Sequence, residues 1–200
     1  MSVRTTEKTI RQFITEVSDA HYAMAGAVIA AGAAQAAALG EACMQLSLEN
    51  QVDKLDWAGV SARIEQMVHL KQTLIEWCDQ DASTMTELVD PAVVGDELQQ
   101  RRLLCESPAE IARLAIEAAA MLQDFRPLVF AQVQDDLEMA LALLAGAGRA
   151  AIMLLDSNLR IWSSEPALLR EFEPVLTGLE QQLEQLRPLK RIRNSAMEEG

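Results

Sequence analysis

The chain has 200 residues, enough for one domain, and half of them are hydrophobic, so it can bury a substantial core. Its formal net charge of −13 at pH 7 argues against general binding to nucleic acids or to anionic membranes, because both would repel it. The three cysteines are odd in number and lack CxxC spacing, which argues against a disulfide framework and a zinc site; we expect them to be reduced.

The first half of the chain predicts three helices. Apolar residues at helical spacing predict an amphipathic helix over residues 5–17. A second helix, made mostly of Ala and Gly, is predicted over about residues 20–49. A third is predicted over about residues 56–89, and Asp90-Pro91 breaks it.

The second half predicts further helices. A short helix is expected over residues 96–104, and Ser107-Pro108 then indicates an N-cap and a proline at the first position of a new helix over residues 109–122. An apolar helix over residues 137–155 and a closing helix over about residues 166–186 follow. No window alternates with period two, so the predicted fold is all-α, a helical bundle forming one domain.

The second predicted helix has one face with almost no side-chain volume. Small residues recur there at three-four spacing: Gly26, Ala30, Ala33, Ala34 and Ala37. Such a face lets another helix approach closer than the usual distance of about 8–10 Å between axes. Two interpretations stay open: a central helix buried in a crowded bundle, or a close contact at which neighbouring loops converge on a ligand.

Two apolar runs are candidates for membrane spans, residues 22–40 and 137–155. Ala and Gly contribute little to membrane insertion, and Gln35 lies inside the first run; Glu138 and Arg149 interrupt the second. The first residues are polar and helix-like, unlike a signal peptide. We therefore expect no membrane span and a cytoplasmic protein.

Titratable residues offer few catalytic signals, since the chain has no GxGxxG, Walker, HExxH or GxSxG motif. The only histidines, His21 and His69, are not placed together by any pattern, and no metal site is predicted. Arg149, unlike the histidines, has a predicted partner. It interrupts an apolar run, and an arginine in such a run usually pairs with a carboxylate.

Two acidic pairs are candidates for chemistry. Asp79 and Asp81 lie late in the third predicted helix, two positions apart, so their carboxylates point to different faces; the alternative is a solvated helix face. Asp135 and Asp136 open the helix over residues 137–155. Their alternative role is capping, because carboxylates stabilise a helix N-terminus.

Four stretches, in this order, are similar to elements of one known family. "IAAGAAQAAAL" (29–39) is similar to an Ala/Gly-rich helix with an LAGALGAAL pattern, and "DQDA" (79–82) to a DEDA element. "SPAEIARLAIEAA" (107–119) resembles a proline-started helix. "DDLEMALALLAGAGRAAIMLLDSN" (135–158) follows SDxxVAxxLAxxAxRGAxxNVxIN position by position. Over about residues 8–160 the chain resembles the cyclodeaminase/cyclohydrolase family: formimidoyltetrahydrofolate cyclodeaminase and bacterial methenyltetrahydrofolate cyclohydrolase.

The resemblance implies an all-helical homodimer that binds a folate near a glycine turn and the subunit contact. We expect that contact to use the small-residue face of residues 26–37. Carried over by position, the family's aspartate falls on Asp136, its arginine on Arg149 and its final asparagine on Asn158, while Asp81 matches the second acid of the long helix. Tyr22 and Gly26 bound the segment that stands in place of the glycine turn.

The chain departs from the family pattern around the expected pocket. In residues 22–26 only Gly26 is small enough to stand in for the turn, and Tyr, Ala and Met do not give its backbone freedom. An LTxGK element reads Leu-Ser-Leu-Glu-Asn at residues 46–50, and the first asparagine of the last element is Leu154. The scaffold pattern is retained and the pocket pattern is eroded.

Two functions follow from the resemblance. The first is an enzyme that hydrolyses a methenyltetrahydrofolate or closes the ring of a formiminotetrahydrofolate with loss of ammonia. Asp136 would move the proton, Asp81 would assist, and Arg149 would orient Asp136 or bind a substrate carboxylate. Tyr22, Gly26 and Asn158 would bind the substrate, with no metal and no other cofactor. The alternative is a catalytically degenerate family member that acts as a helical binding or assembly module.

Overall fold

The computed structural model describes residues 4–50, 57–89 and 97–192, and these residues contain helices and no strand, which confirms the all-α, single-domain prediction. The α-helices are α1 (Ile10–Asp19), α2 (Ala25–Asn50), α3 (Trp57–Val89), α4 (Glu97–Phe125), α5 (Gln134–Ile161) and α6 (Pro166–Gln185). Three short 3-10 helices are η1 (Thr5–Glu7), η2 (Arg126–Leu128) and η3 (Ala131–Val133).

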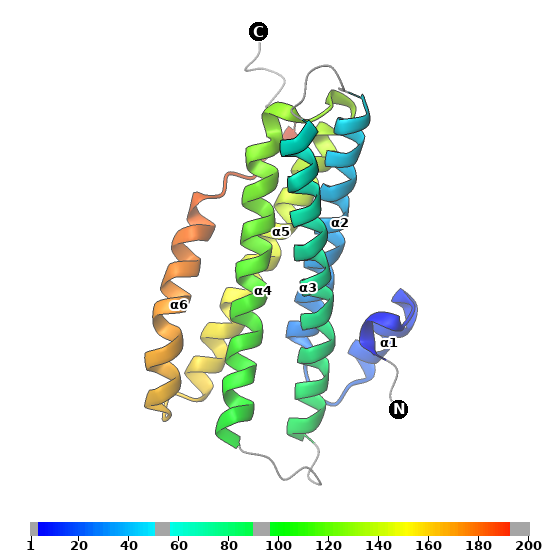
Figure 1. The fold of residues 1–200 in the computed structure, drawn as a ribbon. Helices are drawn as coiled ribbons and strands as arrows, with labels where there is room; N and C mark the ends of the chain where they lie inside the picture. The colour runs from blue at the N-terminus through cyan, green and yellow to red at the C-terminus, as the bar shows by residue number, and fades with distance from the viewer. Residues whose placement is uncertain (1–3, 51–56, 90–96, 193–200) are drawn as a thin grey trace.

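Helices α2 to α5 run alternately up and down and form a four-helix bundle (Figure 1). Helix α2 packs against α3 and α5, and α4 packs against α3 and α5. Helix α6 lies against α4 and α5, while α1 stands outside the bundle beside α2 and α3. The starts of α2 and α4 therefore lie at the same end of the bundle as the ends of α3 and α5.

Helix α2 is buried on its small-residue face. Ala30, Ala33 and Ala37 are 0% exposed, and a Cβ added at Gly40 would lie 2.6 Å from a methyl carbon of Leu122 in α4. This burial exists within one chain, so the expectation that this face makes the subunit contact is wrong. Ala and Gly are needed here because neighbouring helices approach closely, which agrees with a central buried helix.

Helix α4 is continuous, whereas the sequence predicted two helices, over residues 96–104 and 109–122. Pro108 lies inside it and removes the N–H that would bond the carbonyl four residues earlier, that of Leu104. Asn158 of α5 donates its amide N–H to the Leu104 carbonyl oxygen at 2.7 Å instead. The helix continues through the proline because another element satisfies the freed acceptor.

Several other helices begin or end at residues different from those that the sequence predicted. Helix α1 begins at Ile10, after a capping box between Thr9 and Gln12, and α2 begins at Ala25 rather than near residue 20. Helix α5 extends beyond the predicted 137–155 at both ends. The predicted break at Asp90-Pro91 lies outside the described residues.

Two helical segments, Ala25–Asn50 and Ala131–Ile161, are long and apolar enough to cross a membrane by length and composition alone. A buried core helix meets the same criterion. Here 50% and 44% of the respective apolar windows are buried within the bundle. The helices therefore give weak support to a membrane span, and the cytoplasmic location stays a prediction.

Candidate functional site

A cavity of about 300 Å³ lies at the end of the bundle where α2 and α4 begin and α3 and α5 end. Three of the predicted site residues line it: Gly26 of α2, Asp81 of α3 and Asn158 of α5. The other lining side chains are mostly apolar and include Met85, Leu104 and Trp162. Four helices thus bring together residues that lie far apart in the sequence.

Asp81 is the buried charged group of this cavity, with 3% of its surface exposed. Its Oδ2 accepts a hydrogen bond from the backbone N–H of Ala27 at 2.9 Å, and its Oδ1 accepts one from Ser107 Oγ at 2.8 Å. Burial raises the pKa of Asp81 above its ordinary value, and the two hydrogen bonds oppose that rise. Asp81 is therefore not part of a solvated helix face.

Gly26 gives the Asp81 carboxylate its space. A Cβ added at this glycine would lie 2.2 Å from Asp81 Oδ1 and 2.4 Å from its Cγ, which is closer than non-bonded atoms can approach. No glycine among the described residues has a positive φ. Gly26 therefore acts through its lack of a side chain rather than through an unusual backbone conformation.

Asn158 is half-buried at the cavity wall. Its amide N–H bonds the Leu104 carbonyl, as described above, and its amide oxygen accepts no hydrogen bond from the described residues. An amide held in place through its nitrogen leaves its oxygen as an acceptor for a ligand. Asn158 thus combines a structural bond with a free polar atom at the cavity.

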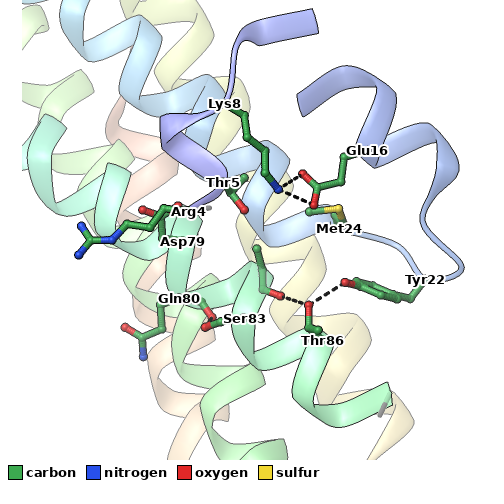
Figure 2. Close-up of a pocket in the computed structure, with 11 residues that line it drawn as sticks. Arg4, Thr5, Lys8, Glu16, Tyr22, Met24, Asp79, Gln80, Ser83 and Thr86 are labelled. Carbon is green, nitrogen blue, oxygen red and sulfur yellow. Dashed lines mark hydrogen bonds and ion pairs between the residues drawn. The ribbon is translucent and has the colours of Figure 1, made fainter. Parts of the chain in front are cut away.

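Tyr22 lines a different pocket, of about 380 Å³, between the N-terminal segment and α3 (Figure 2). Its hydroxyl lies 2.8 Å from Thr86 Oγ1. In the same pocket Asp79 accepts hydrogen bonds from the backbone N–H and hydroxyl of Thr6, at 2.9 and 2.7 Å. Asp79 therefore fixes η1 against α3 and points away from Asp81, as the spacing of the two acids predicted.

Asp136 and Arg149 lie outside both pockets and are exposed. Asp136 is in the first turn of α5, 22 residues before Asn158, which corresponds to about 33 Å along the helix. It makes no side-chain hydrogen bond within the described residues, although its charge suits the helix N-terminus. Arg149 has no ion pair there either, so its expected carboxylate partner is absent from the described part of one chain.

A family model described as formiminotransferase-cyclodeaminase matches residues 9–168 of the 200. The chain belongs to the formiminotransferase-cyclodeaminase family. This confirms the resemblance drawn from the sequence and supports a folate-related role of the cyclodeaminase type. The matched range includes every residue named above at the cavity. No curated protein matches the chain.

Other reactive side chains of this formiminotransferase-cyclodeaminase family member lie apart from the cavity. His21 and His69 are exposed, and no group of three or more His, Cys, Asp or Glu within the described ranges could hold a metal ion. The cysteines are free and buried, and burial raises the thiol pKa of Cys43 to about 11 and that of Cys78 to about 12. These thiols stay protonated at neutral pH.

Ser107 is a site residue that the sequence did not indicate, since the Ser-Pro pair predicted an N-cap. Its distance along the chain from the connection between α3 and α4 could have indicated it. Because the two helices are antiparallel neighbours, residues about equally far from the connection face each other. Asp81 lies eight residues before the end of α3 and Ser107 ten after the start of α4, so the two are expected to meet.

Proposed function

We propose that the protein is a folate one-carbon enzyme of the methenyltetrahydrofolate cyclohydrolase or formimidoyltetrahydrofolate cyclodeaminase type, and that its reaction takes place in the Gly26–Asp81–Asn158 cavity. The observation that carries the proposal is the buried Asp81 carboxylate, held against the glycine at the start of α2. Family membership supports a folate derivative as the substrate class.

Asp81 has the properties of a general acid–base group. A carboxylate whose pKa is raised above its ordinary value by burial is a stronger base than an exposed aspartate, so it accepts a proton more readily. When ionised, it favours the cationic methenyl ring or the amidinium of a formimino group. Each carboxylate oxygen has two lone pairs, so the bonds from Ala27 and Ser107 leave acceptor capacity for a substrate proton.

The chemistry needs one proton-transfer group at the reacting carbon. In hydrolysis, water adds to the methenyl carbon and gives a proton to the carboxylate. One ring C–N bond then breaks, the departing nitrogen takes that proton, and the hydroxyl on the carbon releases its own proton to solvent as it becomes the formyl carbonyl. In cyclodeamination, the second nitrogen, N10 outside the ring, attacks the formimino carbon carried by the ring nitrogen N5 and gives its proton to the carboxylate. The bond from this carbon to the imino nitrogen then breaks, and that nitrogen takes the proton and leaves as ammonia. The apolar side chains of Met85, Leu104 and Trp162 suit a flat heterocycle, and Asn158 offers an acceptor.

The alternative, a catalytically degenerate binding or assembly module, also has a specific observation in its favour. Asp81 connects α2 to α4 through its two hydrogen bonds, and such a bond network stabilises a helix junction without chemistry. The cavity volume lies at the lower limit of ligand pockets, about 300 Å³. Activity measurements separate the two functions.

The first test compares Asp81→Asn with Asp136→Asn in the turnover of methenyl- and formiminotetrahydrofolate. Asp81→Asn should lower kcat by about a hundredfold or more, because the proton acceptor is lost. Asp136→Asn, exposed and far from Asn158 in the same chain, should keep wild-type turnover. A loss confined to Asp136→Asn would contradict the assignment. A wild type that neither binds nor converts either compound would leave the module as the function.

Ser107→Ala provides a test that does not remove the acid. The variant loses a hydrogen bond that lowers the pKa of Asp81, so the pKa in the pH profile of kcat should move to higher pH. A conservative Ser107→Thr variant keeps a hydroxyl and should keep the profile. If the profile of Ser107→Ala is unchanged, the pKa in the pH profile of kcat does not belong to Asp81.

A further inference from the structure

Residues 20–24, which connect α1 to α2, lie between the two pockets described above. We call these residues the 20–24 segment, the pocket that Tyr22 lines the polar pocket, and the cavity that holds Asp81 the Asp81 cavity. Tyr22 and Met24 line the polar pocket, whereas Ala23, between them in the chain, lines the Asp81 cavity. Successive residues therefore face opposite sides, and the segment forms a thin wall between two spaces.

Helix α3 contributes to both pockets at the place where they meet. Ala82 and Thr86 line the polar pocket, and Met85 lines the Asp81 cavity. Positions three and four apart are neighbours on the surface of a helix, so these three side chains form one continuous patch. The two pockets are therefore adjacent along α3, with the 20–24 segment between them.

The size of each pocket is small for a whole folate. The Asp81 cavity has a volume of about 300 Å³ and the polar pocket one of about 380 Å³, whereas sites for drug-sized ligands occupy about 300–1,000 Å³. A tetrahydrofolate derivative joins a reduced pterin ring to an aminobenzoyl group and a glutamate. The Asp81 cavity suits the ring, and the rest of the molecule needs a second space.

The charges of the two pockets decide which end of a folate each one suits. Arg4 and Gln80 line the polar pocket, and Arg4 makes no ion pair within the described residues (Figure 2). Lys8 is already occupied, because it bonds both carboxylate oxygens of Glu16, at 2.7 and 2.6 Å. A guanidinium and an amide bind carboxylates through their N–H groups. The Asp81 cavity has a carboxylate of its own, which would repel those of the glutamate.

The 20–24 segment is fastened to α3 by the Tyr22 hydroxyl, which lies 2.8 Å from Thr86 Oγ1 (Figure 2). Thr86 Oγ1 donates its hydrogen to the Ala82 carbonyl, also at 2.8 Å, so Tyr22 is the donor to Thr86. Within the described residues, the other hydrogen bonds of the segment join it to α1 and α2 and not to α3. One side-chain hydrogen bond thus holds the wall in place against α3.

Helix α1, which precedes the 20–24 segment, opposes its displacement little. None of the residues of α1 is buried, and Ile10 and Ile14 are 69% and 60% exposed. Segments with few buried apolar contacts open locally at a low free-energy cost. The N-terminal part of the chain is fixed to α3 through η1 instead, where Thr6 bonds Asp79.

We propose that the 20–24 segment is a gate, closed by the Tyr22–Thr86 hydrogen bond, and that a folate binds across it. The ring lies at Asp81, and the glutamate carboxylates lie in the polar pocket. The inference rests on the proposed function and adds to it a movable wall and a place for the charged end of the substrate. It also gives Tyr22 a role that a glycine at this position could not perform, since a glycine has no hydroxyl to fasten the gate.

The first test needs no ligand. Amide hydrogen exchange of residues 20–24 should be about two- to tenfold faster in Tyr22→Phe and Thr86→Val than in the wild type, because each loses the bond that closes the gate. Thr73→Val is the matched control. Thr73 lies on the same helix and donates to the His69 carbonyl at 3.0 Å, as Thr86 does to Ala82, but it lines neither pocket. Its variant should exchange as the wild type does.

The second test is calorimetric titration with formyltetrahydrofolate, which carries the glutamate, and with tetrahydropterin, which is the ring alone. Tyr22→Phe and Thr86→Val should bind formyltetrahydrofolate about two- to tenfold more tightly than the wild type and Thr73→Val, because a larger fraction of the protein is open. The Kd of tetrahydropterin should be equal in all four proteins. The ring does not pass the gate, since the Asp81 cavity also opens to solvent beside Ile161, which is 63% exposed.

The third test places the charged end of the substrate. Arg4→Ala should weaken the binding of formyltetrahydrofolate by about two- to fivefold and leave that of tetrahydropterin unchanged. Arg11→Ala is the control, because Arg11 is an exposed arginine of α1 that does not line the polar pocket. An Arg4→Ala variant that binds both probes as the wild type does would contradict the placement of the carboxylates.

Three other results would overturn the gate. The first is equal hydrogen exchange of residues 20–24 in the wild type and Tyr22→Phe. The second is an affinity for formyltetrahydrofolate that does not rise in the two gate variants, and the third is an affinity for tetrahydropterin that rises with it. If the wild type converts a folate in any of these cases, the proposed reaction at Asp81 stands and only the gate fails. If no variant binds formyltetrahydrofolate and the wild type converts no folate, both proposals fail together.

Discussion

Gly26 and Asp81 form the contact on which the cavity depends, because the carboxylate occupies the place where any other residue at position 26 would put its Cβ. The same carboxylate accepts the backbone N–H of Ala27, one of the first N–H groups of α2, which have no acceptor within the helix. A single side chain of α3 thus both stabilises the start of α2 and supplies the buried acid. The residue that we propose as the proton-transfer group therefore also has a structural role.

Gly26→Ala should lower the free energy of unfolding by about 1–3 kcal/mol, because the new methyl group overlaps the Asp81 carboxylate and the backbone must shift. Gly178→Ala in α6 is the control: its Cβ meets no atom within 4 Å, so the higher helix propensity of Ala should raise stability by about 0.4–1 kcal/mol. Urea denaturation of both variants measures the difference. Equal effects at the two positions would contradict the close contact.

The pH dependence of stability should report the buried acid directly. Burial raises the pKa of Asp81 above 3.8, so the folded state holds the proton more tightly than the unfolded state does. The stabilisation from this group is therefore fully present below pH 3.8 and is lost as the pH rises through the folded-state pKa. The free energy of unfolding of the wild type, relative to Asp81→Asn, should fall as the pH rises from about 4. A relative stability that rises over this range would show a depressed pKa instead.

Among the helices, α4 shows how one element depends on another. Pro108 would end or kink the helix if the Leu104 carbonyl had no donor, and Asn158 of α5 supplies one. The continuous helix carries Ser107 to Asp81 and carries Leu104 to the cavity wall. The packing of α4 on α5 therefore determines the shape of the site as well as the path of the helix.

Asn158→Ala should cost about 1–3 kcal/mol of unfolding free energy, because the buried Leu104 carbonyl loses its donor. In a Pro108→Ala background the same change should cost less, since an alanine in place of the proline provides the N–H that bonds this carbonyl within α4. A double-mutant cycle by urea denaturation measures the coupling, which we expect to be about 0.5–3 kcal/mol. Additive effects would mean that the two residues do not share the Leu104 carbonyl.

For the whole molecule, the close packing around α2 is the central feature of the bundle. Helix α2 touches α3, α4 and α5, and its buried surface consists mostly of Ala and Gly. Large side chains that fill the remaining core come from the partners, including Leu122 of α4 opposite Gly40. The opposite side of α2 faces solvent, where Val28 is 42% exposed and Leu46 41%.

Ala33→Leu should destabilise the single chain by about 1–3 kcal/mol or more, because Ala33 is 0% exposed and the core has no room for three more carbons. Ala38→Leu, at an exposed position of the same helix, should change the free energy of unfolding by less than about 0.5 kcal/mol. Thermal melting measures both. An Ala33→Leu variant that melts like the wild type would place this residue outside the core.

The amino-acid sequence by itself determined the helical class, most of the helix positions, the family, and the three residues that meet at the cavity, Gly26, Asp81 and Asn158. These features are set by periodicity and residue type within a few turns of chain, or by motifs that a family retains. The tertiary structure alone decided that α4 passes through Pro108, because the donor to Leu104 comes from a residue 54 positions away. It also decided that Asp136 and Arg149 lie outside the cavity of their own chain, since α5 is one continuous helix on which they precede Asn158 by 22 and 9 residues. The packing of the other helices likewise decided which side of α2 is buried and which is exposed. Local sequence does not encode that choice, because both sides of the helix consist of small and apolar residues.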